Sequence, residues 1–437
     1  MTLRTGVIFL AVTLFITGCS RDFILEGERF PLRAPFSEDA GEQPENRSVP
    51  ISLPATTVNS NWTHRLGSAA SRSVHPALGS SLEQLWSVSI GQGDGRRHRI
   101  TAEPVAANDL IFTLDSRARV TAVRSNGTVA WTRDLTPAWT RSSDSASGGG
   151  LAIAEGRLYV TSAFGKLWAL DPASGEDIWS KRFDAPISAP PTIAGGMAYV
   201  VASDSTGWAL DAATGQTDWQ LSGAPSPSSM VGGAAPALAG DMVLFPTPAG
   251  ELIAARRDTG QIMWRRAVAG TRLGVAYASV TDVTGDPVVQ GDVIYVGNQS
   301  GRVMALDRRT GSPRWTADEA AYGPVWPVAG SLFLMSDRNR LIRLEQNGGE
   351  FVWGTELPLF TQTRERRRAG IFPHYGPLLA GGRMIVGSGD GVLRSFDPVS
   401  GEILSETPLR GGAASAPIAV GNTLYVVSRD GQLVAFR

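Results

Sequence analysis

The stretch "LDPASGEDIW", residues 170–179, returns as "LDAATGQTDW" at 210–219 and as "LDRRTGSPRW" at 306–315. Each copy has an aspartate, a glycine four residues later and a tryptophan four residues after that. An aspartate can accept hydrogen bonds from amides just ahead in a tight turn, and glycine tolerates the positive φ that such a turn needs. A tryptophan buries a large apolar area when it packs against a neighbouring unit. The phrase therefore indicates a structural unit that is repeated, and not a ligand site that is used many times.

The tryptophans set the period of this repeat. They follow one another at intervals of 38 to 51 residues, and Ser405 continues the series. The seven positions, which we predict to dock between blades, are Trp86, Trp131, Trp179, Trp219, Trp264, Trp315 and Trp353. A period of this length, made of short strand-type segments, is typical of a β-propeller with four strands per blade.

The two ends of the periodic region complement each other. The last unit, "PIAVGNTLYVVSRDGQLVAFR" at 417–437, supplies three strands, and "EQLWSVSI" at 83–90 supplies a fourth. A closed ring leaves no open sheet edge between its first and last blades. We therefore predict an all-β fold over residues 82–437, an eight-bladed propeller of four-stranded antiparallel blades whose last blade is completed by the N-terminal strand.

The N-terminal residues predict a lipid anchor. Residues 1–18 have the basic start and the apolar run of a signal peptide, and "ITGC" at 16–19 has the pattern of a bacterial lipobox. Cys19 is then the expected site of lipidation, which would anchor the chain to a membrane. Residues 19–81 show no sustained period and are predicted to be a lipidated N-terminus followed by a flexible tether. Ser20 follows the cysteine, and a serine there favours sorting of the lipidated chain to the outer membrane.

The composition argues against several kinds of chemistry. Cys19 is the only cysteine, so no thiol remains for a disulfide, a nucleophile or a metal ligand. A net charge of −1 gives no signature of nucleic-acid binding. None of the four histidines lies at zinc-ligand spacing from another; they are His64, His75, His98 and His374. We predict no catalytic residue, no cofactor and no metal site.

The pattern G-x-[LV]-x-A-[LF]-D-x-x-[TS]-G-x-x-x-W resembles the tryptophan-docking repeat of quinoprotein-type (PQQ-like) propellers. With the lipobox and the tether, the whole chain resembles the BamB family of outer-membrane protein assembly lipoproteins. The resemblance implies a non-enzymatic scaffold of the BAM complex, a monomer within it, that faces the periplasm. It would bind the periplasmic domains of BamA, contact other assembly subunits and aid the insertion of outer-membrane proteins. The alternatives are a PQQ-dependent quinoprotein oxidoreductase, although the vicinal cysteine pair of those enzymes is missing, and another propeller-type periplasmic binding protein.

Long connectors point to the binding face. Four of them join the outer strand of one blade to the inner strand of the next, at 136–149, 222–232, 269–285 and 358–373. In antiparallel blades they share the face opposite the repeated turn, and long loops gathered on one face of a repeat scaffold commonly bind partners. The resemblance implies that the loops before the fourth and fifth blades meet BamA. The matching residues, which we predict as the partner interface, are Met230, Val231, Asp282 and Thr284.

Overall fold

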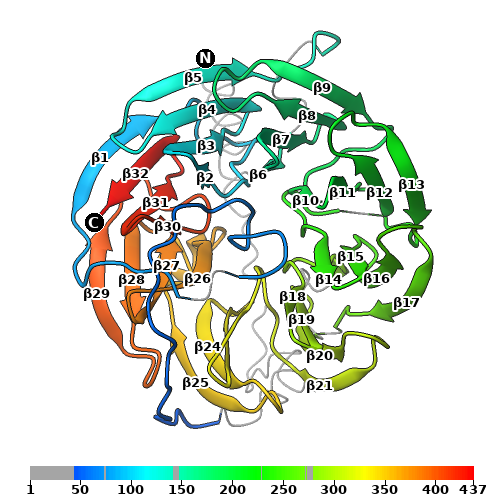
Figure 1. Cartoon of the computed structure of the whole chain (residues 1–437). Coiled ribbons are helices and arrows are strands. Elements are labelled where there is room, and N and C mark those ends of the chain that lie inside the picture. The colour runs from blue at the N-terminus through cyan, green and yellow to red at the C-terminus, as the bar shows by residue number, and fades with distance from the viewer. Residues whose placement is uncertain (1–43, 73–74, 141–146, 228, 271, 273–278) are drawn as a thin grey trace, which may run out of the picture. The chain divides into compact units, whose positions relative to one another are not determined.

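Eight four-stranded antiparallel sheets succeed one another around a ring (Figure 1). The structure is a computed structural model that describes residues 44–72, 75–140, 147–227, 229–270, 272 and 279–437, and residues 44–437 form one compact unit. The predicted all-β, eight-bladed propeller is confirmed. Among the described residues, the one helix with assigned bounds is the short 3-10 helix η3 (Glu365–Arg367).

Blades 1 to 4 each take four consecutive strands from the inside of the ring to the outside. Their strands are, for blade 1, β2 (Val105–Ala107), β3 (Leu110–Leu114), β4 (Arg119–Arg124) and β5 (Val129–Asp134); for blade 2, β6 (Gly149–Ala154), β7 (Arg157–Ser162), β8 (Lys166–Leu170) and β9 (Asp177–Arg182); for blade 3, β10 (Thr192–Ala194), β11 (Met197–Val201), β12 (Thr206–Asp211) and β13 (Thr217–Ser222); and for blade 4, β14 (Ala237–Ala239), β15 (Met242–Pro246), β16 (Glu251–Arg256) and β17 (Ile262–Ala267).

Blades 5 to 7 repeat this order, and blade 8 draws on both ends of the propeller sequence. Their strands are, for blade 5, β18 (Val288–Gln290), β19 (Val293–Asn298), β20 (Arg302–Asp307) and β21 (Pro313–Ala317); for blade 6, β22 (Trp326–Val328), β23 (Ser331–Met335), β24 (Arg340–Glu345) and β25 (Phe351–Glu356); for blade 7, β26 (His374–Ala380), β27 (Arg383–Ser388), β28 (Val392–Phe396) and β29 (Ile403–Pro408); and for blade 8, β30 (Ile418–Val420), β31 (Thr423–Val427), β32 (Gln432–Phe436) and β1 (Gln84–Ser89).

The ring closes through blade 8, as predicted. Strand β1 pairs antiparallel with β32, and beyond the strand ends Glu83 and Arg437 exchange two backbone hydrogen bonds of 2.8 and 2.9 Å. The pairing leaves no unpaired sheet edge where the ring begins and ends.

Each docking tryptophan contacts the repeated turn of the next blade. The indole of Trp179, for example, lies over Gly215, where an added Cβ would stand 2.6 Å from the ring, and its Nε1 donates a 3.2 Å hydrogen bond to the carbonyl of Ala212. The same ring-on-glycine contact recurs in the pairs Trp86–Gly127, Trp131–Gly175, Trp219–Gly260, Trp264–Gly311, Trp315–Gly349 and Trp353–Gly401. Positive φ and the absence of a side chain are thus both required of these glycines.

The loss of the tryptophan at Ser405 has a topological reason. Ser405 lies on β29, the outer strand of blade 7, and pairs with Ser395 at the register position where Trp219 pairs with Ala209 in blade 3. In blade 8 the two outer strands, β32 and β1, are not consecutive in the chain, so no hairpin turn joins them. A tryptophan at position 405 would therefore have no turn glycine to pack on.

For the segment that precedes the propeller, the structure corrects the prediction of a flexible tether up to residue 81. From Pro44 onwards it belongs to the compact unit, and Trp62, His64 and His75 are buried. In Figure 1 this part of the chain, in blue, crosses the middle of the ring. We call residues 57–72 and 75–77 the channel plug.

The plug reaches all eight blades or the connectors that lead into them. The backbone of Trp62 exchanges two hydrogen bonds with Ala106 of blade 1, at 2.7 and 2.8 Å. The other residues that bond to a blade or its connector are Asn59, Thr63, His64, Arg65, Arg72, His75 and Pro76. Because these bonds go to blades far apart in the sequence, the plug ties the ring together from within.

Candidate functional site

The propeller has two unlike faces. Antiparallel order puts the first and third hairpin turns of each blade on one face, which carries the repeated turn; we call it the repeated-turn face. The second turns and the inter-blade connectors lie on the opposite face, which we call the connector face. The four predicted long connectors are present, at 135–148, 223–236, 268–287 and 357–373, and a fifth, at 90–104, is as long as these but was not predicted.

A cavity of about 560 Å³ opens on the connector face. Its floor is formed by the plug residues Trp62, Arg65 and Arg72, so the plug ends the channel there. Its walls come from the connectors that enter blades 1, 4, 5, 6, 7 and 8, and from second turns such as that of Arg429. The cavity is therefore a mouth closed at depth by the protein's own chain.

The structure brings the four predicted interface residues to this cavity, but it gives them different roles. Met230 and Val231 lie on the rim, and the Val231 side chain is 53% exposed. Asp282 is only 4% exposed, and its Oδ2 accepts a 2.5 Å hydrogen bond from the backbone N–H of Met230. Thr284 is buried and donates from Oγ1 to the carbonyl of Ala321 at 2.9 Å. Asp282 and Thr284 thus shape the wall, and Val231 is the residue of the set that is open to a partner.

Burial raises the pKa of Asp282, although the hydrogen bond from Met230 works against that rise. The carboxylate spans the connectors before blades 4 and 5, and so fixes one relative to the other. The Asp282 carboxylate is therefore placed to hold the two loops together, and little of it is exposed.

Beneath the rim lies a buried ionic cluster that the sequence analysis did not identify. Arg65 of the plug bonds from Nε to Glu103 at 2.9 Å and from Nη1 to Asp286 at 3.0 Å. Burial alone would lower the pKa of Arg65, but the two carboxylates hold it above its ordinary value. Burial raises the pKa of Glu103 and of Asp286. The sequence does not predict a role for Arg65, because it lies in a segment without periodicity and a single arginine there forms no recognisable motif.

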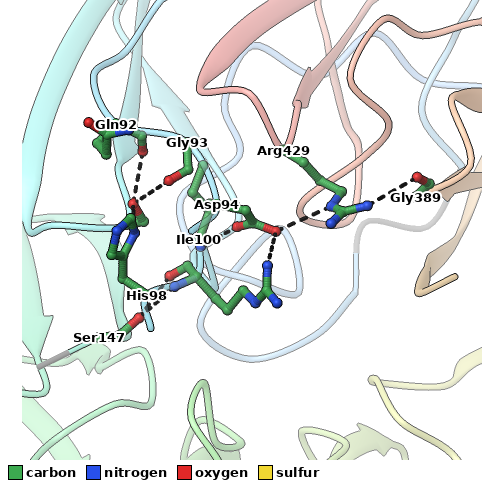
Figure 2. A network of polar contacts seen from close by, with 10 residues as sticks. Gln92, Gly93, Asp94, His98, Ile100, Ser147, Gly389 and Arg429 are labelled. Atoms are coloured by element: carbon green, nitrogen blue, oxygen red, sulfur yellow. Dashed lines mark hydrogen bonds and ion pairs between the residues drawn. The ribbon is translucent and has the colours of Figure 1, made fainter. Parts of the chain in front are cut away.

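A second polar network joins three blades at the mouth (Figure 2). Asp94, in the connector that enters blade 1, accepts from the backbone N–H of Ile100 at 2.9 Å and pairs with Arg99 and Arg429. Arg429 of blade 8 also donates to the carbonyl of Gly389 in blade 7, at 3.4 Å. The network supports the ring on the connector face at the blades where the docking tryptophan is missing.

Comparison with known proteins places this geometry in a family. A family model described as outer membrane protein assembly factor BamB matches residues 116–355 and 361–437. The chain belongs to the BamB family. The BamB of Pseudomonas aeruginosa is 31% identical over 357 residues, which cover 81% of this chain and 89% of that relative.

Solved structures agree on the fold. The crystal structure of BamB from Moraxella catarrhalis superposes with a TM-score of 0.67 at 23% identity, covering 82% of this chain and all of that one. The quinohemoprotein alcohol dehydrogenase of Comamonas testosteroni gives a TM-score of 0.64 at 16% identity, over 86% of this chain and 80% of that one. At such identities the likeness shows a shared propeller fold and nothing more.

Two predictions concern features that the structure does not address. The signal peptide at 1–18 and Cys19 lie outside the described residues. Among the residues that are described, no helix has the length and apolarity to cross a membrane.

Proposed function

We propose that this BamB-family chain is a non-enzymatic scaffold of the outer-membrane protein assembly complex that docks the periplasmic domains of BamA on its connector face. Lipidation at Cys19 anchors it to the outer membrane, facing the periplasm. It acts as a monomer within the complex and aids the folding and insertion of outer-membrane proteins.

The observation that carries the proposal is where apolar side chains are exposed. Most of the large exposed apolar side chains lie on outer strands, and Val58 lies in the plug. The remaining four lie on long connectors of the connector face: Trp139, Val231, Phe360 and Ile371. Two of them, Val231 and Ile371, line the cavity. Exposed apolar side chains at a cavity that also carries polar residues are typical of a protein docking surface.

The presence of the plug favours a scaffold function over an oxidoreductase function. An enzyme that held a cofactor in the channel would need that volume, and here Trp62, His64 and the Arg65 cluster fill part of it. Removing them would leave Glu103 and Asp286 as buried carboxylates without their cation, which is costly.

The test is recovery of BamA periplasmic domains on immobilised chain. Val231→Glu and Ile371→Glu each place a charge in the proposed surface, at side chains 53% and 54% exposed. Leu404→Glu on outer strand β29 and Met263→Glu on outer strand β17 are matched controls, at 56% and 51% exposure. We expect at least tenfold lower recovery with the two connector variants and native recovery with the two controls.

Native recovery with both connector variants, each with an unchanged thermal transition, would refute docking on this face. Recovery of a quinone-type chromophore with the purified chain, together with dye-linked oxidation of an alcohol or a sugar, would overturn the scaffold itself.

A further inference from the structure

The floor of the connector-face cavity carries a cation with no carboxylate beside it. Arg72 donates from Nε to the carbonyl of Val325 at 2.9 Å and from Nη2 to that of Pro324 at 2.5 Å, and it stacks over the Trp326 ring at 4.4 Å from the centroid. In the described part of the chain no ion pair involves Arg72, and its Nη1 has no hydrogen-bond partner there. The side chain lines the cavity.

The other cavity arginines differ from Arg72 in this respect. Arg65 has both carboxylates of the buried cluster, and Arg99 and Arg429 share Asp94. Asp286 and Glu103 act on Arg72 only through space, and their effect is smaller than that of burial, which lowers the pKa of Arg72 to about 9. Arg72 therefore stays protonated at neutral pH, and an anion beside it would compensate for the hydration that burial has removed.

The cavity lining is partly apolar and aromatic. The connector that enters blade 6 brings Tyr322 and Pro324, whose carbonyl accepts from Arg72, and the connector that enters blade 7 brings Ile371 and Phe372, followed by Tyr375. The lining is polar at Thr101 and at the paired groups around Asp94. A ligand that suits such a lining has an anionic group, an apolar group and further polar groups.

Charge on the connector that enters blade 7 favours an anion as well. The connector that bears Ile371 and Phe372 also carries the exposed run 364–368, in which four arginines accompany one glutamate. Cations on a protein surface attract anions and raise their rate of association.

We propose that this cavity binds the carboxyl end of a peptide chain whose last residue is apolar. The terminal carboxylate takes two charge-assisted contacts at Arg72, and the last side chain packs against Tyr322, Phe372 and Tyr375. The polar groups of the lining bond to the backbone amides that precede this residue, so a peptide suits the site better than a fatty acid does. The volume of about 560 Å³ is within the range of sites that bind small ligands. This inference does not depend on docking of BamA, because the ligand lies inside the mouth.

The experiment titrates the purified full-length chain with acetyl-Gly-Gly-Leu as the free acid and as the carboxamide, by isothermal titration calorimetry. We expect the acid to bind at least tenfold more tightly than the amide. Arg72→Gln should reduce this preference to less than twofold. Arg383→Gln is the matched control, since Arg383 also holds the N-terminal segment, by a hydrogen bond to the carbonyl of Gly79, but lies outside the cavity; it should keep the native preference.

Equal affinity of acid and amide for the native chain would overturn the proposal, and so would a full preference in a folded Arg72→Gln. If that variant does not fold, crosslinking decides: the same acid with a photoreactive benzophenone should label residues 322–326 or 371–377 of the native chain. Labelling elsewhere would refute the site. Binding of octanoate without binding of the peptide acid would refute the peptide as its ligand.

Discussion

The repeated-turn face and the connector face are built from the same eight blades, yet they follow opposite rules. On the first, seven turn glycines each receive a tryptophan ring from the preceding blade, with little variation in geometry. On the second, connectors differ in length and sequence, and apolar side chains such as Val231 stay exposed. Regularity marks the face that builds the fold, and irregularity marks the face that is free to recognise something else.

The largest effect should come from breaking one joint of the repeated-turn face. Trp353 is fully buried against Gly401, so Trp353→Ala should lower the free energy of unfolding by about 3–5 kcal/mol. Ser405→Ala, at the equivalent position of the joint without a tryptophan, should change it by less than about 0.5 kcal/mol. Denaturant unfolding measures both; equal losses would contradict the role given to the joints.

Two glycines allow the stability cost of backbone strain to be separated from the cost of contact with a tryptophan ring. Gly311 has φ +67°, and a Cβ there would lie 2.5 Å from the Trp264 ring. Gly196 has φ +75° with nothing within 4 Å. Gly196→Ala should cost about 1–2 kcal/mol for its backbone alone, and Gly311→Ala about 2–4 kcal/mol because the ring must also move. If the two variants lose the same stability, contact between the Trp264 ring and residue 311 adds nothing to the cost of backbone strain.

The plug should make stability depend on pH. Burial lowers the pKa of His64 from 6.5 to about 4, and its Nε2 accepts from the backbone N–H of Ile193. The unfolded chain takes up a proton below pH 6.5 and the folded chain does not until about pH 4. Stability from this group is therefore complete above pH 6.5 and is lost as pH falls towards 4, by up to about 3 kcal/mol.

His64→Gln keeps an acceptor for Ile193 and removes the titration. Between pH 6.5 and 4 the native chain should lose up to about 3 kcal/mol more stability than this variant. Parallel pH profiles of the two proteins would show that His64 is not buried as a neutral ring.

The smallest effect on stability is expected on the connector face. Val231→Glu should change the free energy of unfolding by less than about 0.5 kcal/mol, because the side chain is already 53% exposed. A loss comparable to that of Trp353→Ala, again by denaturant unfolding, would mean that this rim supports the fold.

This contrast also decides what the sequence could predict. The repeat predicts the blades, their closure and the tryptophan positions because each copy reports the same local contact. The plug has no period, and its residues bond to different blades, as Trp62 and His64 do. Nothing local distinguishes such a segment from a tether. In the same way, the family resemblance at Asp282 identifies a loop that lines the cavity. It does not predict that Asp282 itself is buried in the wall, because burial depends on contacts between loops that are distant in the sequence.

The repeated-turn face carries the tryptophan joints between blades, and the connector face is the one that we propose to bind the partner. Amide hydrogen exchange of the chain, with and without the periplasmic domains of BamA, tests this division most directly. We predict new protection in connectors 223–236 and 357–373, and none in the repeated turns 171–175 and 211–215. Protection confined to the repeated turns, with the connectors unchanged, would contradict the account.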